Sequence, residues 1–529
     1  MEEDRVSLLM EDWAVNVDVL DKDLQKAQWN KPSIYKLPAT TTGGSNDNNK
    51  KSAAYFPHTV SFGPYHHDKG DHLKKMDPHK RRVLGHFLQR YKITLQKLVD
   101  SLTTTNYRWQ QVDHTDNVSD PKELPIDIQK EVLPVLQHLM DAYDSLDDKW
   151  LHDHDGFLKL MILDGCFMLE ILQWSSVNDE HKALESGSIS EATASVVRRN
   201  KRKTTASALT GSVDDYCYAD NDPIFSLHGK LYFMSYIRRD MLMLENQLPM
   251  LLLKTLLGAA LPTEPKEAIE KHLNTIILNF CGGNSEYENQ NMSPCLHVLD
   301  LNRKSLLQSK NLPERLCKTK NCSKVKDRTF IFGHRKCTAQ KNRTAAQRSV
   351  TNLHESGIKF EESTSNFHPT EIWVEGHTLK LPVVDIDDTI ESKLLNLMAF
   401  ERIHVGVGND ITSYVYFMDS IIDSADDVKI LRTSGVLINS IGSDKAVAKL
   451  FNELSKDVTP DPENMLEKIV LKELDDHCKN QWNEWRATLS HTYFKSPWAF
   501  LSLLAAVLLL ALTISQTFYA IYGYYKPRK

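Results

Sequence analysis

The sequence predicts a mainly α fold, with a multi-helix globular body, a small β-hairpin element and one C-terminal transmembrane helix. Three observations predict it: apolar residues recur at three- and four-residue spacing, one short stretch alternates as a strand does, and residues 496–525 carry no charged side chain. With 529 residues, of which 41% are hydrophobic and 25% charged, the chain is long enough to bury a large core.

Amphipathic periodicity places the helices. Residues 129–151 and 157–174 carry apolar side chains at helical spacing, and Asp155 is available to cap the second segment. Residues 231–257 contain one apolar stripe, which Pro249 is expected to kink or divide because proline removes a backbone donor. Further helices are expected at residues 392–400, 411–422, 426–434, 445–456 and 463–486.

One β-hairpin is predicted. Residues 372–384, IWVEGHTLKLPVV, alternate between apolar and polar side chains on either side of Glu375 and Gly376. A glycine-containing pair between two alternating runs is typical of a hairpin turn.

The C-terminal helix is expected to cross a membrane. Its core, AFLSLLAAVLLLALTI at residues 499–514, is almost wholly apolar, and about 20 such residues span a bilayer. Aromatic side chains at both ends suit the level of the lipid headgroups. The span is assigned to residues 497–522, with a short basic tail at 523–529.

The body is expected to lie in the cytosol, attached by this anchor to the plasma membrane or an endomembrane. The N-terminal stretch lacks the basic flank and apolar core of a secretory signal, although basic residues after the span slightly favour a cytosolic C-terminus. Eight cysteines in so long a chain do not form a dense disulfide framework. In a secretory lumen, sequons would be glycan acceptors at Asn117, Asn291, Asn321 and Asn342.

Two polar stretches interrupt the helical pattern. Residues 186–222 contain too few large apolar side chains to offset the entropy lost on ordering. Between Glu314 and Arg348 there are eleven Lys or Arg residues and two acids. We expect an acidic amphipathic N-terminal segment with a flexible lead-in at residues 1–52. Helical parts of one domain are expected at 53–185, 223–310 and 349–495. Two insertions separate them: a polar and basic disordered one at 186–222 and a basic cysteine-containing one at 311–348.

One motif suggests catalysis. VVDIDDT at residues 383–389 fits the D-x-D-x-T pattern of magnesium-dependent phosphatases, in which Asp385 would attack phosphorus and Asp387 would act as acid and base, with Thr389 as the third motif residue. Such a nucleophile follows a buried parallel strand, whereas this motif follows a hairpin and precedes helices. A strand end or helix-capping turn is the favoured interpretation.

A second motif suggests a metal. Cys317, Cys322, His334 and Cys337 supply the soft ligands of a structural zinc site. Their spacing lacks paired C-x2-C knuckles, so free thiols in a loop are the favoured alternative, and no metal or cofactor is assigned.

Other polar clusters are interpreted as surface features. The groups HHD at 66–68 and HDHD at 152–155 do not converge, because adjacent side chains point in different directions. RRNKRK at 198–203 could be a nuclear address or contact anionic lipid, but a solvated charge run is favoured. A net charge of −6 argues against wholesale nucleic-acid binding. The common nucleotide, zinc-protease and hydrolase motifs do not occur, so we expect no enzyme, no nucleic-acid partner and no small-molecule substrate.

Five longer motifs occur along the chain. They are VSFGPYHHDKGDHLKKMDPHKRRVLGHFLQR (60–90), MILDGCFMLEIL (161–172), RRDMLMLENQLP (238–249), LHESGIKF (353–360) and WRATLSHTYFKSPW (485–498). Together they closely resemble a plant family called domain of unknown function 247, also labelled UPF0481, and the resemblance runs in order from about residue 56 to residue 525.

The resemblance implies a plant membrane protein with a mostly helical body and a C-terminal span, without an assigned catalytic centre. No site residues carry over from it. Some grass members are associated with self-incompatibility between pollen and stigma. We therefore expect a membrane-anchored recognition or signalling protein that acts through unknown protein partners, with a generic membrane adaptor as the alternative.

Overall fold

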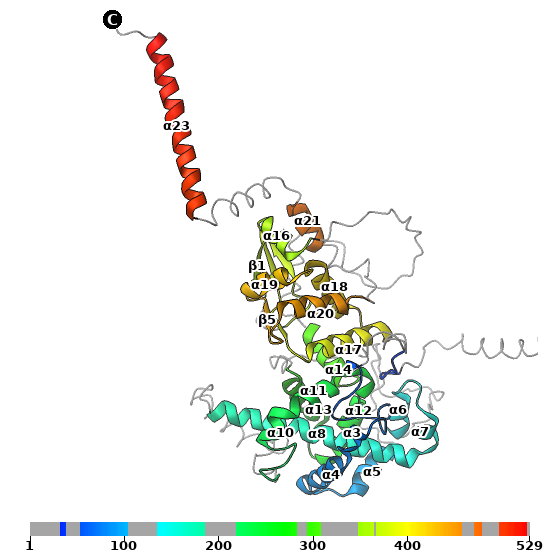
Figure 1. The fold of residues 1–529 in the computed structure, drawn as a ribbon. Helices are drawn as coiled ribbons and strands as arrows, with labels where there is room; N and C mark the ends of the chain where they lie inside the picture. The colour runs from blue at the N-terminus through cyan, green and yellow to red at the C-terminus, as the bar shows by residue number, and fades with distance from the viewer. Residues whose placement is uncertain are drawn as a thin grey trace, which may run out of the picture.

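The protein is mainly helical, as predicted, with two small sheets and a long C-terminal helix (Figure 1). Its structure is a computed structural model. The residues described are 32–38, 53–103, 135–185, 218–282, 294–307, 348–363, 367–456, 470–478 and 497–525. Outside them lie the expected N-terminal helix, most of both insertions and most of the segment 463–486.

Helix α8 (His154–Glu185) is the centre of the first half of the body. The helices that pack most extensively against it are α4 (Asp77–Tyr91), α12 (Met250–Ala260) and α13 (Lys266–Cys281). Gly165 permits the approach of α12, because a Cβ at this position would overlap the Leu256 side chain. The other helices of this half are α3 (Asp71–Lys74), α5 (Leu95–Thr103), α6 (Val135–Asp141), α7 (Asp148–His152), α10 (Leu227–Tyr232), α11 (Met234–Met241), the 3-10 helix η3 (Leu244–Asn246) and α14 (Val298–Leu307).

The helix predicted at 129–151 is interrupted. After α6 the backbone pairs with residues 33–34, where the Ile34 N–H donates to the Ala142 carbonyl at 2.9 Å and the Asp144 N–H donates to the Ile34 carbonyl at 2.8 Å. This pairing takes hydrogen-bonding groups that a continuous helix would use. Residues 32–38, which the sequence prediction left in the N-terminal segment outside the domain, contribute buried side chains to the core.

Two boundaries of α8 and the following insertion differ from the prediction. The Asp153 carboxylate accepts the Gly156 N–H at 2.8 Å, so Asp153 rather than Asp155 binds the start of α8. Asp222, assigned to the disordered insertion, is buried and accepts the N–H groups of Ile224 and Phe225, both at 2.9 Å. The insertion therefore gives way to the packed body before residue 223.

The long helix predicted at 231–257 is divided, but over more residues than Pro249 alone explains. Helix α11 ends at Met241, η3 follows, and α12 begins at Met250 directly after Pro249. The chain between α11 and α12 forms the polar site described below.

The second half contains both sheets. The predicted hairpin is confirmed: β2 (Trp373–Glu375) and β3 (Thr378–Leu381) pair antiparallel, and Gly376 adopts a φ of +62° in the turn. Three further strands were not predicted, because each is short and pairs in parallel with a strand distant in sequence, so no hairpin turn marks it. They are β1 (Lys359–Glu362), which pairs in parallel with β3, and β4 (Val384–Ile386) and β5 (Leu437–Asn439), which pair in parallel with each other.

Helices predicted in this half are confirmed where the structure describes them, with boundaries shifted by a few residues. They surround the sheets near the upper end of the body in Figure 1. They are α16 (Val350–Glu355), α17 (Ile390–Ile403), α18 (Asp410–Ile421), α19 (Ala425–Thr433), α20 (Asp444–Leu454) and α21 (Lys472–Cys478), of which α16 was not predicted.

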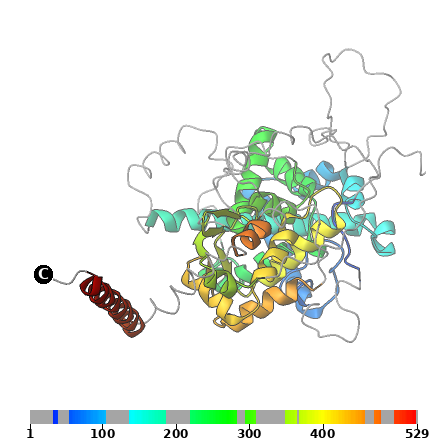
Figure 2. The same cartoon turned by 90° about the horizontal axis from the view of Figure 1, so that it is seen from above.

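The last helix, α23 (Pro497–Tyr525), is long and apolar enough to cross a membrane. Its segment Leu504–Tyr522 has a mean hydropathy of 2.0, and none of it is buried in the protein. Figures 1 and 2 show it apart from the body. A helix that is apolar on all sides and unburied matches the predicted C-terminal span by length and composition.

Candidate functional site

The break between α11 and α12 is stabilised by two buried side-chain amides. The Gln247 Nε2 group donates to the carbonyls of Met241 at 2.6 Å and Met243 at 2.7 Å. The Asn246 Nδ2 group donates to the Asp240 carbonyl at 2.9 Å. Asp240 and Met241 are the last residues of α11, whose carbonyls have no N–H four residues on within the helix, so the amides supply donors there; the Met243 carbonyl, beyond the helix, also accepts the Asn246 N–H at 3.1 Å.

The same turn binds an irregular backbone segment, residues 58–63. The fully buried Asp240 carboxylate accepts the N–H groups of residues 58–60 at 2.7 to 3.1 Å. Asn246 Oδ1 accepts the Phe62 N–H at 2.7 Å, and its Nδ2 donates to the Val60 carbonyl at 3.0 Å. Burial raises the pKa of Asp240, while the three N–H groups and Arg239 oppose that shift.

A buried ion pair completes the binding of residues 58–63. Lys80 Nζ lies 2.7 Å from Asp164 Oδ1, and both side chains are buried. The ammonium also donates to the Ser61 carbonyl at 2.6 Å, and the second carboxylate oxygen accepts the Gly63 N–H at 2.8 Å. Because each partner has further hydrogen bonds, this pair meets the condition under which a buried charge is tolerated.

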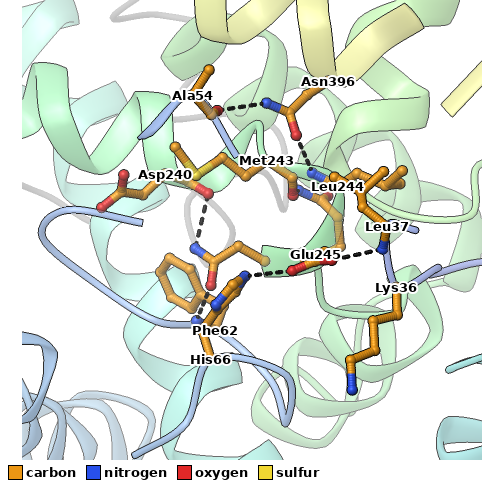
Figure 3. Close-up of polar contacts among 12 residues, drawn as sticks. Lys36, Leu37, Ala54, Phe62, His66, Asp240, Met243, Leu244, Glu245 and Asn396 are labelled. Carbon is orange, nitrogen blue, oxygen red and sulfur yellow. Dashed lines mark hydrogen bonds and ion pairs between the residues drawn. The ribbon is translucent and has the colours of Figure 1, made fainter. Parts of the chain in front are cut away.

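Asn396 ties the second half of the body to this turn. Its side chain lies on α17, where Oδ1 accepts the Leu244 N–H at 2.9 Å and Nδ2 donates to the Ala54 carbonyl at 3.1 Å (Figure 3). On the opposite side, Gln247 Oε1 accepts the Leu299 N–H at 3.0 Å. The side chains of Asp164, Asp240, Asn246, Gln247 and Asn396, with Lys80, are called the polar network below.

At the edge of the network, Glu245 bridges two N-terminal segments. Its carboxylate accepts the Leu37 N–H at 2.6 Å and lies 3.1 Å from His66 Nε2 (Figure 3). Burial favours a higher pKa for Glu245, but His66, the Leu37 N–H and Lys69 together hold the pKa below its ordinary value. His66 is buried, so the interpretation of HHD as a surface cluster is wrong for this residue.

His297 is a buried histidine between the N-terminal segment and α14. Its Nε2 lies 3.0 Å from the Ser33 carbonyl, and its Nδ1 accepts the Asp300 N–H at 3.2 Å. A ring that donates from one nitrogen and accepts at the other is neutral. Burial lowers the pKa of His297 to about 4, against the opposing effects of Asp300 and the Ser33 carbonyl.

A separate buried ion pair positions α18. Arg303 Nε donates to Glu401 Oε1 at 2.8 Å. The Glu401 carboxylate also accepts the N–H groups of Ile411 at 3.1 Å and Thr412 at 2.9 Å. A carboxylate on the first N–H groups of a helix is stabilised by the helix dipole. Glu401 therefore fixes the start of α18 against α17.

The residues of the phosphatase motif form local structure. Asp385 is exposed on β4 and accepts the Ser440 hydroxyl at 2.8 Å, while Asp387 Oδ1 accepts the Thr389 N–H and hydroxyl, both at 2.9 Å. The strand does pair in parallel, but in a sheet of only two strands. The favoured interpretation, a strand end followed by a turn into α17, describes what these side chains do.

The expected metal ligands Cys317, Cys322, His334 and Cys337 lie outside the described residues. Within the described part of the chain, no group of three or more His, Cys, Asp or Glu side chains is placed to hold a metal ion. The side chains of HDHD at 152–155 are exposed and make local contacts, as expected. RRNKRK at 198–203 is outside the described residues.

The family model of DUF247, described as a plant protein of unknown function, matches residues 34–512. The chain belongs to the DUF247 family. It is similar to UPF0481 protein At3g47200 of Arabidopsis thaliana, with 27% identity over 499 residues, covering 90% of this chain and 84% of the relative. It is also similar to a second UPF0481 protein of Arabidopsis thaliana, At3g02645, with 31% identity over 176 residues and 33% of each chain covered. No solved structure matches the chain.

The DUF247 membership confirms the resemblance. Three of the motifs that carry it, VSFGPYHHDK, MILDGCFMLEIL and RRDMLMLENQLP, meet in the fold and supply both sides of the polar network. From the sequence these motifs indicated the family, and no structural role was predicted for them. The sequence signal that could have predicted the polar network is Asp240, Asn246 and Gln247 beside an expected helix break, because such side chains bind open backbone groups.

Asn246→Asp tests the polar network without changing its shape. The substitution replaces the Nδ2 donor with an oxygen that faces the carbonyls of Val60 and Asp240, and it buries a charge. We expect a loss of about 3 kcal/mol or more in the free energy of unfolding, measured by denaturation of the detergent-solubilised protein. Asn352→Asp, at an exposed position, is the matched control and should change stability by less than about 0.5 kcal/mol.

Because of His297, we expect the fold to lose stability in acid. The folded pKa of about 4 lies below the unfolded value, so the unfolded chain binds more protons between about pH 6.5 and 4, and stability falls as pH falls through that window. The expected loss from this histidine is about 3 kcal/mol. His297→Gln should flatten the dependence of the unfolding free energy on pH by one proton. An unchanged slope in this variant would exclude His297 as the source.

Proposed function

We propose that the protein is a non-enzymatic, single-pass membrane protein whose helical body acts in recognition or signalling through protein partners. The observation that carries the proposal is α23, whose segment Leu504–Tyr522 is apolar, charge-free and unburied. Such a segment is costly in water and stable in a bilayer.

The non-enzymatic part of the proposal is supported by how the buried acids are used. The carboxylates of Asp164, Asp240 and Glu401 each accept backbone N–H groups inside the protein. A general acid or base must instead reach a proton on a substrate. These side chains position the backbone, and the body is proposed to offer its partners a rigid surface.

The body is proposed to lie in the cytosol, at the plasma membrane or an endomembrane. In the described part of the chain, Cys166, Cys281, Cys295 and Cys478 are buried free thiols. Free thiols are typical of a reducing compartment. Burial raises the pKa of Cys281 and of Cys295 to about 11, so these thiols have a structural and not a reactive character.

The most specific form of the proposal is recognition between pollen and stigma, and its support is the family resemblance alone. Loss of the gene should then make incompatible pollen acceptable in genetic crosses. Unchanged compatibility after gene loss would remove this form and leave a general membrane adaptor.

The anchor is tested by Leu509→Arg combined with Leu510→Arg. Each arginine at the centre of a span costs about 2.5 to 3.5 kcal/mol of insertion free energy. We expect the wild-type protein to stay in microsomal membranes after alkaline carbonate extraction and the variant to be released. Leu151→Arg, at an exposed leucine of the body, is the matched control and should remain membrane-bound.

The same microsomes test the topology. A body that is digested by added protease and not glycosylated at its sequons supports the cytosolic placement. A protected and glycosylated body contradicts it and places the recognition surface outside the cytosol.

A further inference from the structure

An exposed apolar patch lies on α10 and α11. It consists of Leu227, Leu231, Tyr232 and Tyr236, with exposed fractions of 63%, 63%, 61% and 52%, and is called the α10–α11 patch below. These four are half of the eight exposed large hydrophobic residues that the structure describes outside α23. The other four are isolated in the sequence, at Leu95, Leu151, Val405 and Ile438.

The patch is separate from the side chains that bury α11. Met234, Ile237 and Met241 of α11 face the core, whereas the buried residue of α10 is Gly229. A surface helix of a soluble body ordinarily presents polar residues outward. Figure 1 shows α10 at the edge of the body.

The segment that carries the patch is basic. Residues 223–239 contain Lys230, Arg238 and Arg239 and no acid. Arg238 is exposed and lies over the Phe280 ring at 5.2 Å, and Arg239 donates to the Ala53 carbonyl at 2.7 Å and lies near Glu391. The acids that flank the segment, Asp222 and Asp240, are both buried.

We propose that the α10–α11 patch docks on the anionic surface of the bilayer that holds α23. Leucine and tyrosine side chains suit the boundary between headgroups and acyl chains, and the basic side chains complement anionic phosphates. The inference rests on the membrane anchorage in the proposed function. Anchorage by α23 keeps the body close to the lipid surface, so even a weak second contact is occupied.

The test is photo-crosslinking of the full-length protein, reconstituted in vesicles of phosphatidylcholine with or without phosphatidylserine. The probe is photoactivatable phosphatidylserine, and crosslinked peptides are mapped by mass spectrometry. We expect crosslinks in α23 and in residues 227–236, the latter suppressed by competing unlabelled phosphatidylserine and by high salt. Leu227→Asp with Leu231→Asp should lower the crosslinks in residues 227–236 roughly tenfold and leave those in α23 unchanged.

Val405→Asp is the matched control, because Val405 is 72% exposed and far from α10 in sequence. It should leave all crosslinks unchanged. Equal thermal unfolding midpoints of the wild-type protein and both variants show that the substitutions act at the surface.

The outcomes separate the two proposals. Crosslinks in α23 but not in residues 227–236 overturn the docking inference and leave the anchor intact. Absence of crosslinks in α23 overturns the anchor and the inference that rests on it. A dimer of the detergent-solubilised protein that Leu227→Asp with Leu231→Asp dissociates, together with absence of lipid adducts in residues 227–236, overturns lipid docking in favour of a protein interface.

Discussion

The backbone of residues 58–63 runs through the interior without helix or strand partners, so its hydrogen bonds must come from buried side chains. Asp240, Asn246 and Asp164 accept the N–H groups of residues 58, 59, 60, 62 and 63. Each buried N–H left without a partner costs about 1 to 3 kcal/mol. That cost is large against the roughly 5 to 15 kcal/mol by which a typical domain is stable.

The polar network determines where α11 ends and how the two halves of the body are joined. It also leaves the proposed functional surfaces outside the core. Helix α11 has to end before Asn246 and Gln247, because these amides bind its last carbonyls, and Asn396 then joins the second half to the same turn. A fully bonded polar core favours one arrangement of the chain. The surfaces proposed for function lie outside this core, on α23 and on the α10–α11 patch.

The spacing of apolar residues predicted the elements whose own sequence carries the pattern of a helix or a strand. The hairpin of β2 and β3, helices α17 to α20 and the apolar helix α23 each carry their own pattern. The break after Met241 was not predicted, because its cause is contact between side chains and segments distant in sequence. The same limit applies to Ile34, which enters the core by pairing with residues 142–144.

The central claim is tested most directly by hydrogen exchange of the backbone amides of residues 58–60, 62 and 63 in the full-length protein. These amides lie in an irregular segment, and their acceptors are side chains of the polar network. The account predicts exchange as slow as that of the buried part of α8, because both require the body to open. Exchange as fast as that of exposed loops would show that the side chains of Asp164, Asp240 and Asn246 do not hold this segment, and would contradict the account.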